Sequence, residues 1–163
     1  MSRDVNVYAR KEATIPIDEI LAQMRARGIP VDWKTDPFVE FFTGSHAPGA
    51  WTAGYFLPEG STDTKSQISI STKAIEKGTA ERLVAAYKDV ITEPQREALF
   101  AARTLYQLSA GWVSNEERER ILVNLADVLA DLGDGLILDT QTNRFYDRTQ
   151  YRNQFISLFG PKS

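Results

Sequence analysis

The stretch "ILVNLADVLADLGDGLILD", residues 121–139, decides how this chain is expected to fold. Its first part repeats apolar side chains at the 3.6-residue period of an α-helix, and the stripe consists of Ile121, Leu125, Val128, Leu129 and Leu132. Gly133 suits the left-handed position that follows a helix. The apolar "LILD" beyond it has the pattern of a strand. We therefore predict a long helix that leads directly into a β-strand.

Three short motifs predict where helices begin. In each of them a residue that can cap a helix is followed three residues later by Glu or Gln, which is the pattern of a capping box. The pairs are Ser114 with Glu117, Thr92 with Gln95, and Asp147 with Gln150. The long helix therefore starts at "SNEE", and the final helix starts at Asp147 and ends at Gly160.

Two further helices are predicted between residues 76 and 111. The apolar stripe of the first consists of Leu83, Tyr87, Val90 and Ile91. The second begins at Thr92, and its stripe consists of Leu99, Ala102, Leu105 and Tyr106. We expect this second helix to end near Gly111.

Alternating apolar and polar residues predict strands in the first 75 residues. Residues 4–10 form the first strand, a helix follows from about residue 17 to Gly28, and "IPVDW" at 29–33 returns as a strand. Two strands are expected between residues 38 and 56, and one at "QISIS", 67–71. Near the C-terminus, "LILD" and "RFY" predict a hairpin. The fold class is therefore α+β in a single domain over residues 1–163, with an antiparallel or mixed sheet of N-terminal strands and the C-terminal hairpin covered by a run of helices.

Composition excludes several classes of function. The 19 basic and 22 acidic residues give a net charge of −3, which provides no broad basic field for binding nucleic acid. The absence of cysteine excludes disulfides, thiolate catalysis and zinc sites that depend on sulfur. The chain has no apolar segment of signal-peptide or membrane-spanning length, so we expect a cytoplasmic protein that does not contact membranes.

The segment "DTQTNRFYD", residues 139–147, spaces oxygen-bearing side chains roughly as a calcium loop does. An EF-hand loop needs a sharp turn at its sixth position and a bidentate glutamate at its twelfth. Here Arg144 and Gln150 occupy those positions. We therefore interpret the segment as a hairpin turn followed by a helix cap at Asp147, and we expect neither a metal nor another cofactor.

His46 is the single histidine and the residue best suited to acid–base chemistry near neutral pH. One alternative function is a small hydrolase in which His46 acts with a carboxylate such as Asp139 or Asp36. No nucleophile motif accompanies it, and one histidine without cysteine makes a mononuclear zinc centre implausible. A surface loop residue is the simpler interpretation.

Aromatic residues are concentrated between residues 38 and 56. They favour a hydrophobic core, but Trp51, Tyr55 and Phe42 also suit a small-ligand pocket. We keep a ligand-binding module as a second alternative function.

The segment from Glu116 to Asp134 is rich in acids, and its six acids against two bases give it a charge of −4. Such a run is either a solvated helix face or a patch that steers a basic partner. The residues predicted to meet that partner are Glu116, Glu117, Glu119, Asp127 and Asp131. The same acids argue against a helix-turn-helix that binds DNA, because they would repel its phosphates.

The leading hypothesis is a non-enzymatic protein-binding domain, for example a bacterial inhibitor or immunity-type protein that neutralises a partner toxin or enzyme. The sequence defines neither that partner nor an oligomeric state.

Overall fold

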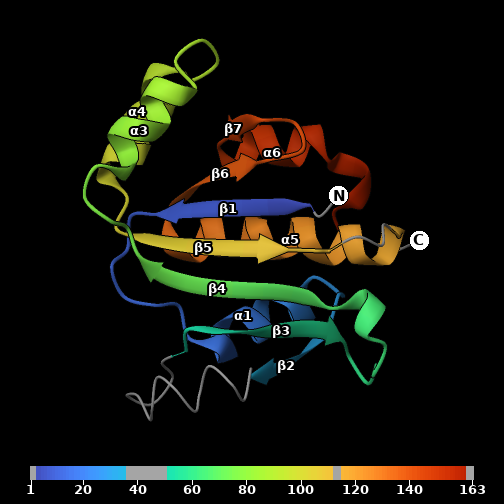
Figure 1. Cartoon of the computed structure of the whole chain (residues 1–163). Coiled ribbons are helices and arrows are strands. Elements are labelled where there is room, and N and C mark those ends of the chain that lie inside the picture. The colour runs from blue at the N-terminus through green and yellow to red at the C-terminus, as the bar shows by residue number, and fades with distance from the viewer. Residues whose placement is uncertain (1–2, 36–50, 112–114, 161–163) are drawn as a thin grey trace.

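A seven-stranded antiparallel sheet organises the part of the chain that the computed structural model describes, which is residues 3–35, 51–111 and 115–160 (Figure 1). The strand order is β2-β3-β4-β5-β1-β6-β7. The strands are β1 (Asp4–Ala9), β2 (Val31–Thr35), β3 (Ala53–Pro58), β4 (Ile68–Ala74), β5 (Thr104–Ser109), β6 (Gly135–Asp139) and β7 (Arg144–Tyr146). The helices are α1 (Ile17–Ala26), α3 (Thr79–Ala86), α4 (Glu93–Ala101), α5 (Glu116–Gly133) and α6 (Arg148–Gln154), with short 3₁₀ turns η1 (Thr64–Ser66) and η2 (Ile156–Leu158).

The four central strands are interleaved. β1 lies between β5 and β6, which α5 connects, and β5 lies between β1 and β4, which are connected through α1 and the β2-β3 hairpin. Two split β-α-β units that share a sheet in this way have the topology of a ferredoxin-like fold. The β2-β3 hairpin, the α3-α4 pair and the β7-α6 segment are additions to that unit.

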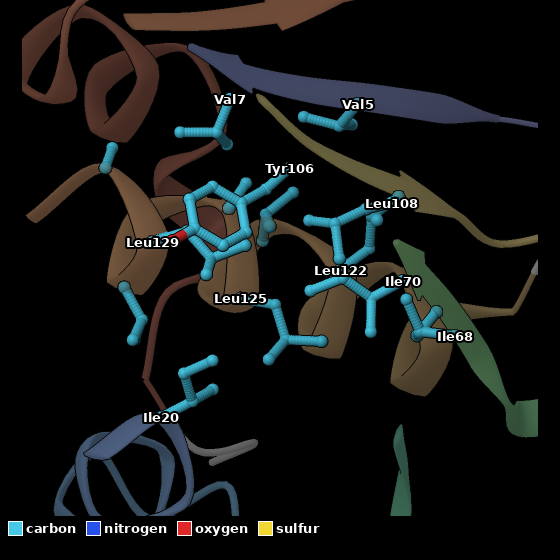
Figure 2. Packing of buried hydrophobic residues seen from close by; sticks show 14 of the residues in the cluster. Val5, Val7, Ile20, Ile68, Ile70, Tyr106, Leu108, Leu122, Leu125 and Leu129 are labelled. Atoms are coloured by element: carbon cyan, nitrogen blue, oxygen red, sulfur yellow. The ribbon is translucent and has the colours of Figure 1, made fainter. Parts of the chain in front are cut away.

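The inner face of the sheet, against which α1 and α5 pack, carries the main core (Figure 2). Because side chains alternate along a strand, Val5 and Val7 of β1 point to this face together with Tyr106 and Leu108 of β5. They meet Leu122, Leu125 and Leu129 of α5, with Ile20 of α1 beyond them. Each fully buried Leu or Ile contributes about 1.5–3 kcal/mol of apolar burial, so this layer holds the fold together.

The outer face of the sheet is only partly covered. A second apolar cluster lies where α3 and α4 cross the ends of the strands, and it joins Tyr8, Leu105, Leu136 and Phe145 to Leu99. No residue of α3 is buried, and the pair projects beyond the strand ends (upper left in Figure 1). Over the other end of the strands, no described helix covers the outer face.

The prediction that a helix runs from Thr92 to Gly111 is wrong in its second half. The helix α4 ends at Ala101, and Thr104–Ser109 is the central strand β5. The error has a physical cause: Leu105 and Tyr106 are both buried, but on opposite faces of the sheet, against the outer cluster and the main core respectively. Burial on both faces removes the alternation that identifies a strand, and the residues at 99, 102 and 105 then match a helical period.

Two predicted helices are shorter than expected: α3 ends at Ala86, before the predicted stripe residues Tyr87, Val90 and Ile91, and α6 ends at Gln154, with the separate 3₁₀ turn η2 before Gly160. The remaining predictions of the fold hold in the described residues. The α+β class is confirmed, as are the long helix, the C-terminal hairpin and the capping boxes at Thr92 and Asp147. The cap of α5 is one residue later than expected, because the Asn115 side chain accepts the hydrogen bond from the Arg118 N–H; Ser114 lies outside the described residues. Of the two strands predicted between residues 38 and 56, the second corresponds to β3 and the first falls outside the described residues. None of the described helices has both the length and the apolar character that crossing a membrane requires.

Candidate functional site

The uncovered half of the outer sheet face contains a shallow hollow of about 440 Å³. β1, β3, β4 and β5 form its floor, and the start of the β6-β7 turn forms one side. We call it the open-face hollow and define it by the outward-facing residues that line it, which are Asp4, Asn6, Ala53, Tyr55, Ser69, Ser71, Gln107, Ser109 and Thr140.

Strand register brings these residues together from distant parts of the sequence. Ser69 of β4 lies opposite Tyr55 of β3 on one side and Ser109 of β5 on the other, and Ser109 lies opposite Asp4 of β1. A second row runs through Ser71 and Gln107 to Asn6 in the same way. Cross-strand neighbours stand about 5 Å apart, so the hollow presents two adjacent rows of polar side chains.

Local sequence explains why these groups face outward. In "ISIS" of β4 the two isoleucines are buried in the main core, which leaves Ser69 and Ser71 on the opposite face. In β5 the buried Tyr106 and Leu108 direct Gln107 and Ser109 outward in the same way.

Much of the hydrogen-bonding capacity in the hollow is unused. In the part of the chain that the structure describes, the side chains of Ser69, Ser71, Gln107 and Ser109 make no hydrogen bond to another protein group. Thr140 differs, because its hydroxyl donates to the backbone oxygen of Asp4 at 2.7 Å. The hollow therefore offers donors and acceptors to whatever occupies it.

The lining carries one formal charge. Asp4 supplies a carboxylate, and neither lysine nor arginine is among the lining residues. Lys34, opposite Tyr55, and Lys73, two residues beyond Ser71, are on the same face and stand at the margins of the two rows. The lining residues themselves thus carry a single negative charge, and the nearest cations on this face are at the margins of the hollow.

The acidic residues predicted to meet a partner occupy very different environments. Asp127 is completely buried on α5 and is therefore unable to contact a partner, which corrects its predicted role. Glu119 pairs with Arg3, Glu116 pairs with Arg120 at 3.0 Å, and Asp131 pairs with Arg148 at 2.9 Å. Glu116, Glu117 and Asp131 keep exposed side chains, so they are what remains of the predicted patch.

Asp127 is the centre of an ion cluster that joins α1, α5 and α6. Its carboxylate oxygens lie 2.8 Å from a guanidinium nitrogen of Arg27 and 2.8 Å from one of Arg152. They also accept two hydrogen bonds from the guanidinium of Arg148, at 3.0 and 3.1 Å. Burial by itself raises the pKa of the Asp127 carboxyl, but the hydrogen bonds from Arg148 and Arg152 and the positive charge of Arg27 outweigh it and leave that pKa below its ordinary value. The carboxylate is therefore ionised and holds three arginines in place.

The segment "DTQTNRFYD" forms a hairpin turn, as predicted. The buried Asp139 accepts hydrogen bonds from the backbone N–H groups of Gln141 and Thr142 and receives Arg3 at 2.9 Å. Asn143 adopts the left-handed conformation with φ of 58°, and Asp147 caps α6. Among the described residues, no group of three or more His, Cys, Asp or Glu side chains could hold a metal ion.

The structure, in the residues that it describes, does not bring together the residues considered for the small hydrolase or those considered for the ligand-binding module. Trp51 is buried in the main core, where its indole N–H donates to the backbone oxygen of Ile15 at 2.7 Å, whereas Tyr55 lines the open-face hollow. Phe42 lies outside the described residues, as do His46 and Asp36. Asp139, the other carboxylate considered for a hydrolase, is engaged in the turn and by Arg3.

Sequence reasoning named Tyr55 but missed the rest of the hollow. The alternation in "QISIS" was sufficient to place Ser69 and Ser71 on one face, although not to show that this face is uncovered. Gln107 and Ser109 gave no such signal because their segment matched a helix.

Searches of protein-family models, of curated proteins and of solved structures found no match to this chain.

Proposed function

We propose that this chain is a non-enzymatic binding module whose site is the open-face hollow. The observation that carries the proposal is the pair of adjacent polar rows on an uncovered sheet face, in which four side chains make no hydrogen bond within the described structure. A site of several hundred cubic ångströms with a few convergent polar groups is of the size that small ligands occupy.

The other charged groups of the described chain support this choice indirectly. The arginines at positions 3, 27, 118, 120 and 148 are engaged with carboxylates or backbone oxygens of the same chain. They stabilise the packing of α5 against its neighbours. The proposed site, in contrast, is a polar surface whose side chains are largely not used in this way.

A second candidate function is protein binding, of the inhibitor or immunity type, with the start of α5 as the contact surface. Glu116 and Glu117 favour it because both are exposed at the first turn of that helix. Acidic side chains at such a position would speed the association of a basic partner. This surface lies on a different element from the hollow, so variants distinguish the two.

The test is retention of material from an extract of the native host by immobilised protein. Ser71→Arg places a long charged side chain in the hollow, Glu117→Lys reverses the acidic surface, and Ser157→Arg introduces the same arginine at an exposed position on η2. We expect Ser71→Arg to lose the retained material while Ser157→Arg and Glu117→Lys keep it. Loss with Glu117→Lys and retention with Ser71→Arg would replace the proposal by the second candidate.

A further inference from the structure

The side chains of the open-face hollow share one chemical property. The hydroxyls of Ser69, Ser71 and Ser109 and the amides of Asn6 and Gln107 can each donate and accept a hydrogen bond. A ligand that uses both capacities of such an array donates and accepts at closely spaced positions. Hydroxyl groups on neighbouring carbon atoms have this property.

Charge narrows the class of ligand further. The lining holds no cation and one carboxylate, that of Asp4, whereas Lys34 and Lys73 stand at its margins, so a phosphorylated or carboxylated ligand inside the hollow would meet a like charge at Asp4. A carboxylate accepts hydrogen bonds readily from hydroxyl donors. The hollow is therefore suited to a neutral ligand.

The sheet face is poorly suited to a peptide or a protein surface. Backbone N–H and C=O groups of β4 and β5 are used in the ladders with β3 and β1, so an added strand has no main-chain partners on this face. Protein interfaces also depend on aromatic and arginine anchors that fill apolar pockets. Tyr55 is the one aromatic residue among the lining residues.

Tyr55 supplies the remaining element of the site. It lies in register between Ser69 on one side and Lys34 on the other, and it is partly exposed. A planar apolar surface beside hydroxyl and amide groups is able to contact the C–H face of a sugar ring while its hydroxyls are bound. From these observations, and resting on the proposed function, we infer that the open-face hollow binds a neutral saccharide.

The experiment is a titration of ¹⁵N-labelled protein with maltose, cellobiose and N,N′-diacetylchitobiose, with inorganic phosphate and tetraalanine as non-saccharide probes. We expect at least one disaccharide to shift the amide signals of Ser69, Ser71 and Gln107 saturably at millimolar concentration or below. We expect no such shift with phosphate or tetraalanine.

Matched variants test whether the side chains make the contacts. Gln107→Ala is expected to weaken saccharide binding about 3- to 10-fold through the loss of a hydrogen bond. Gln154→Ala removes the same group from an exposed position on α6 and is expected to change nothing. Both substitutions are at exposed positions, so thermal melts should show folded proteins.

The outcomes separate this inference from the proposed function. The inference is overturned if none of the disaccharides shifts the hollow, or if phosphate or tetraalanine shifts it instead. In those cases the proposed function still stands if Ser71→Arg abolishes retention from the host extract. If Ser71→Arg leaves that retention unchanged, the proposed function itself is wrong.

Discussion

The two faces of the sheet are built from the same strands but have opposite character. The inner face, covered by α1 and α5, buries apolar side chains together with charged groups that are fully paired. The outer face has an apolar cluster where α3 and α4 cover it, and elsewhere it carries polar side chains together with the charged Asp4, Lys34 and Lys73. The comparison indicates that the inner face stabilises the fold, whereas the outer face presents polar side chains that make no hydrogen bond within the described structure.

The largest effect is expected from the inner face. Leu125→Ala removes a completely buried side chain between the sheet and α1 and should lower the free energy of unfolding by about 3–4 kcal/mol. Urea denaturation measures this loss. A change below about 1 kcal/mol would mean that this layer is not the core of the fold.

Asp127→Asn should have the second-largest effect, about 2–3 kcal/mol at neutral pH, because it removes the counter-charge of three arginines. The guanidiniums of Arg148 and Arg152 are partly exposed, with 35% and 45% of their side chains accessible, and water therefore offsets part of the loss.

The same variant has a defined pH dependence. Because the pKa of Asp127 is lowered by folding, its contribution is present above the ordinary aspartate pKa of about 3.9 and is lost as the pH falls through the lower folded value. Denaturation at a series of pH values should therefore show the wild type and Asp127→Asn converging in acid. A gap that stays constant down to the lowest pH would contradict the assignment.

An intermediate effect is expected where α4 closes part of the outer face. The buried side chain of Gln95 accepts from the Thr92 N–H at 3.0 Å and donates to the Phe145 backbone oxygen at 3.0 Å and to Gln150 Oε1 at 3.2 Å. Gln95→Ala breaks these bonds at the edge of β7 and should destabilise the protein by about 1–2 kcal/mol. Gln154→Ala, which alters an exposed glutamine on α6, is the matched control in the same melts.

Tyr151→Phe sharpens the comparison by testing a polar atom on the closed side. The Tyr151 side chain is completely buried, and its hydroxyl has no hydrogen-bond partner in the described structure. Removing an unsatisfied hydroxyl should leave the melting temperature unchanged or raise it slightly. A destabilisation above about 1 kcal/mol would reveal that the hydroxyl has a partner, such as a buried water.

The smallest effect is expected on the open face. Ser71→Ala and Gln107→Ala should each change the free energy of unfolding by less than about 0.5 kcal/mol, because neither side chain makes a hydrogen bond within the described structure. Thermal and urea melts give the values. A larger loss would mean that these groups stabilise the fold, which is the property assigned to the inner face.

Parts of the fold could be predicted because the signals are local. The periodicity of α5, the capping boxes of α4 and α6 and the hairpin at Asp139 depend on residues a few positions apart. The strand β5 was not predicted, because it has buried apolar residues on both faces of the sheet and therefore lacks the alternation of apolar and polar residues that identifies a strand.

The open-face hollow could not be predicted as a site. It exists because β3, β4, β5 and β1 are neighbours in the sheet, and this order depends on pairing between residues as far apart as Asp4 and Ser109. For Asp127 the sequence suggested the wrong environment. Its acidic neighbours in the sequence indicated an exposed patch, but its three arginine partners come from distant segments, α6 and the end of α1, and bury it.

Hydroxyl-radical footprinting of the protein with and without the material it retains from its host tests the binding surface most directly. Tyr55 reports on the open-face hollow, and Phe100 and Ile156, with 43% and 71% of their surfaces exposed, report on the rest of the molecule. We predict that bound material lowers the oxidation of Tyr55 and leaves Phe100 and Ile156 unchanged. Oxidation of Tyr55 that is the same in both states, with protection at Phe100 or Ile156, would contradict the account.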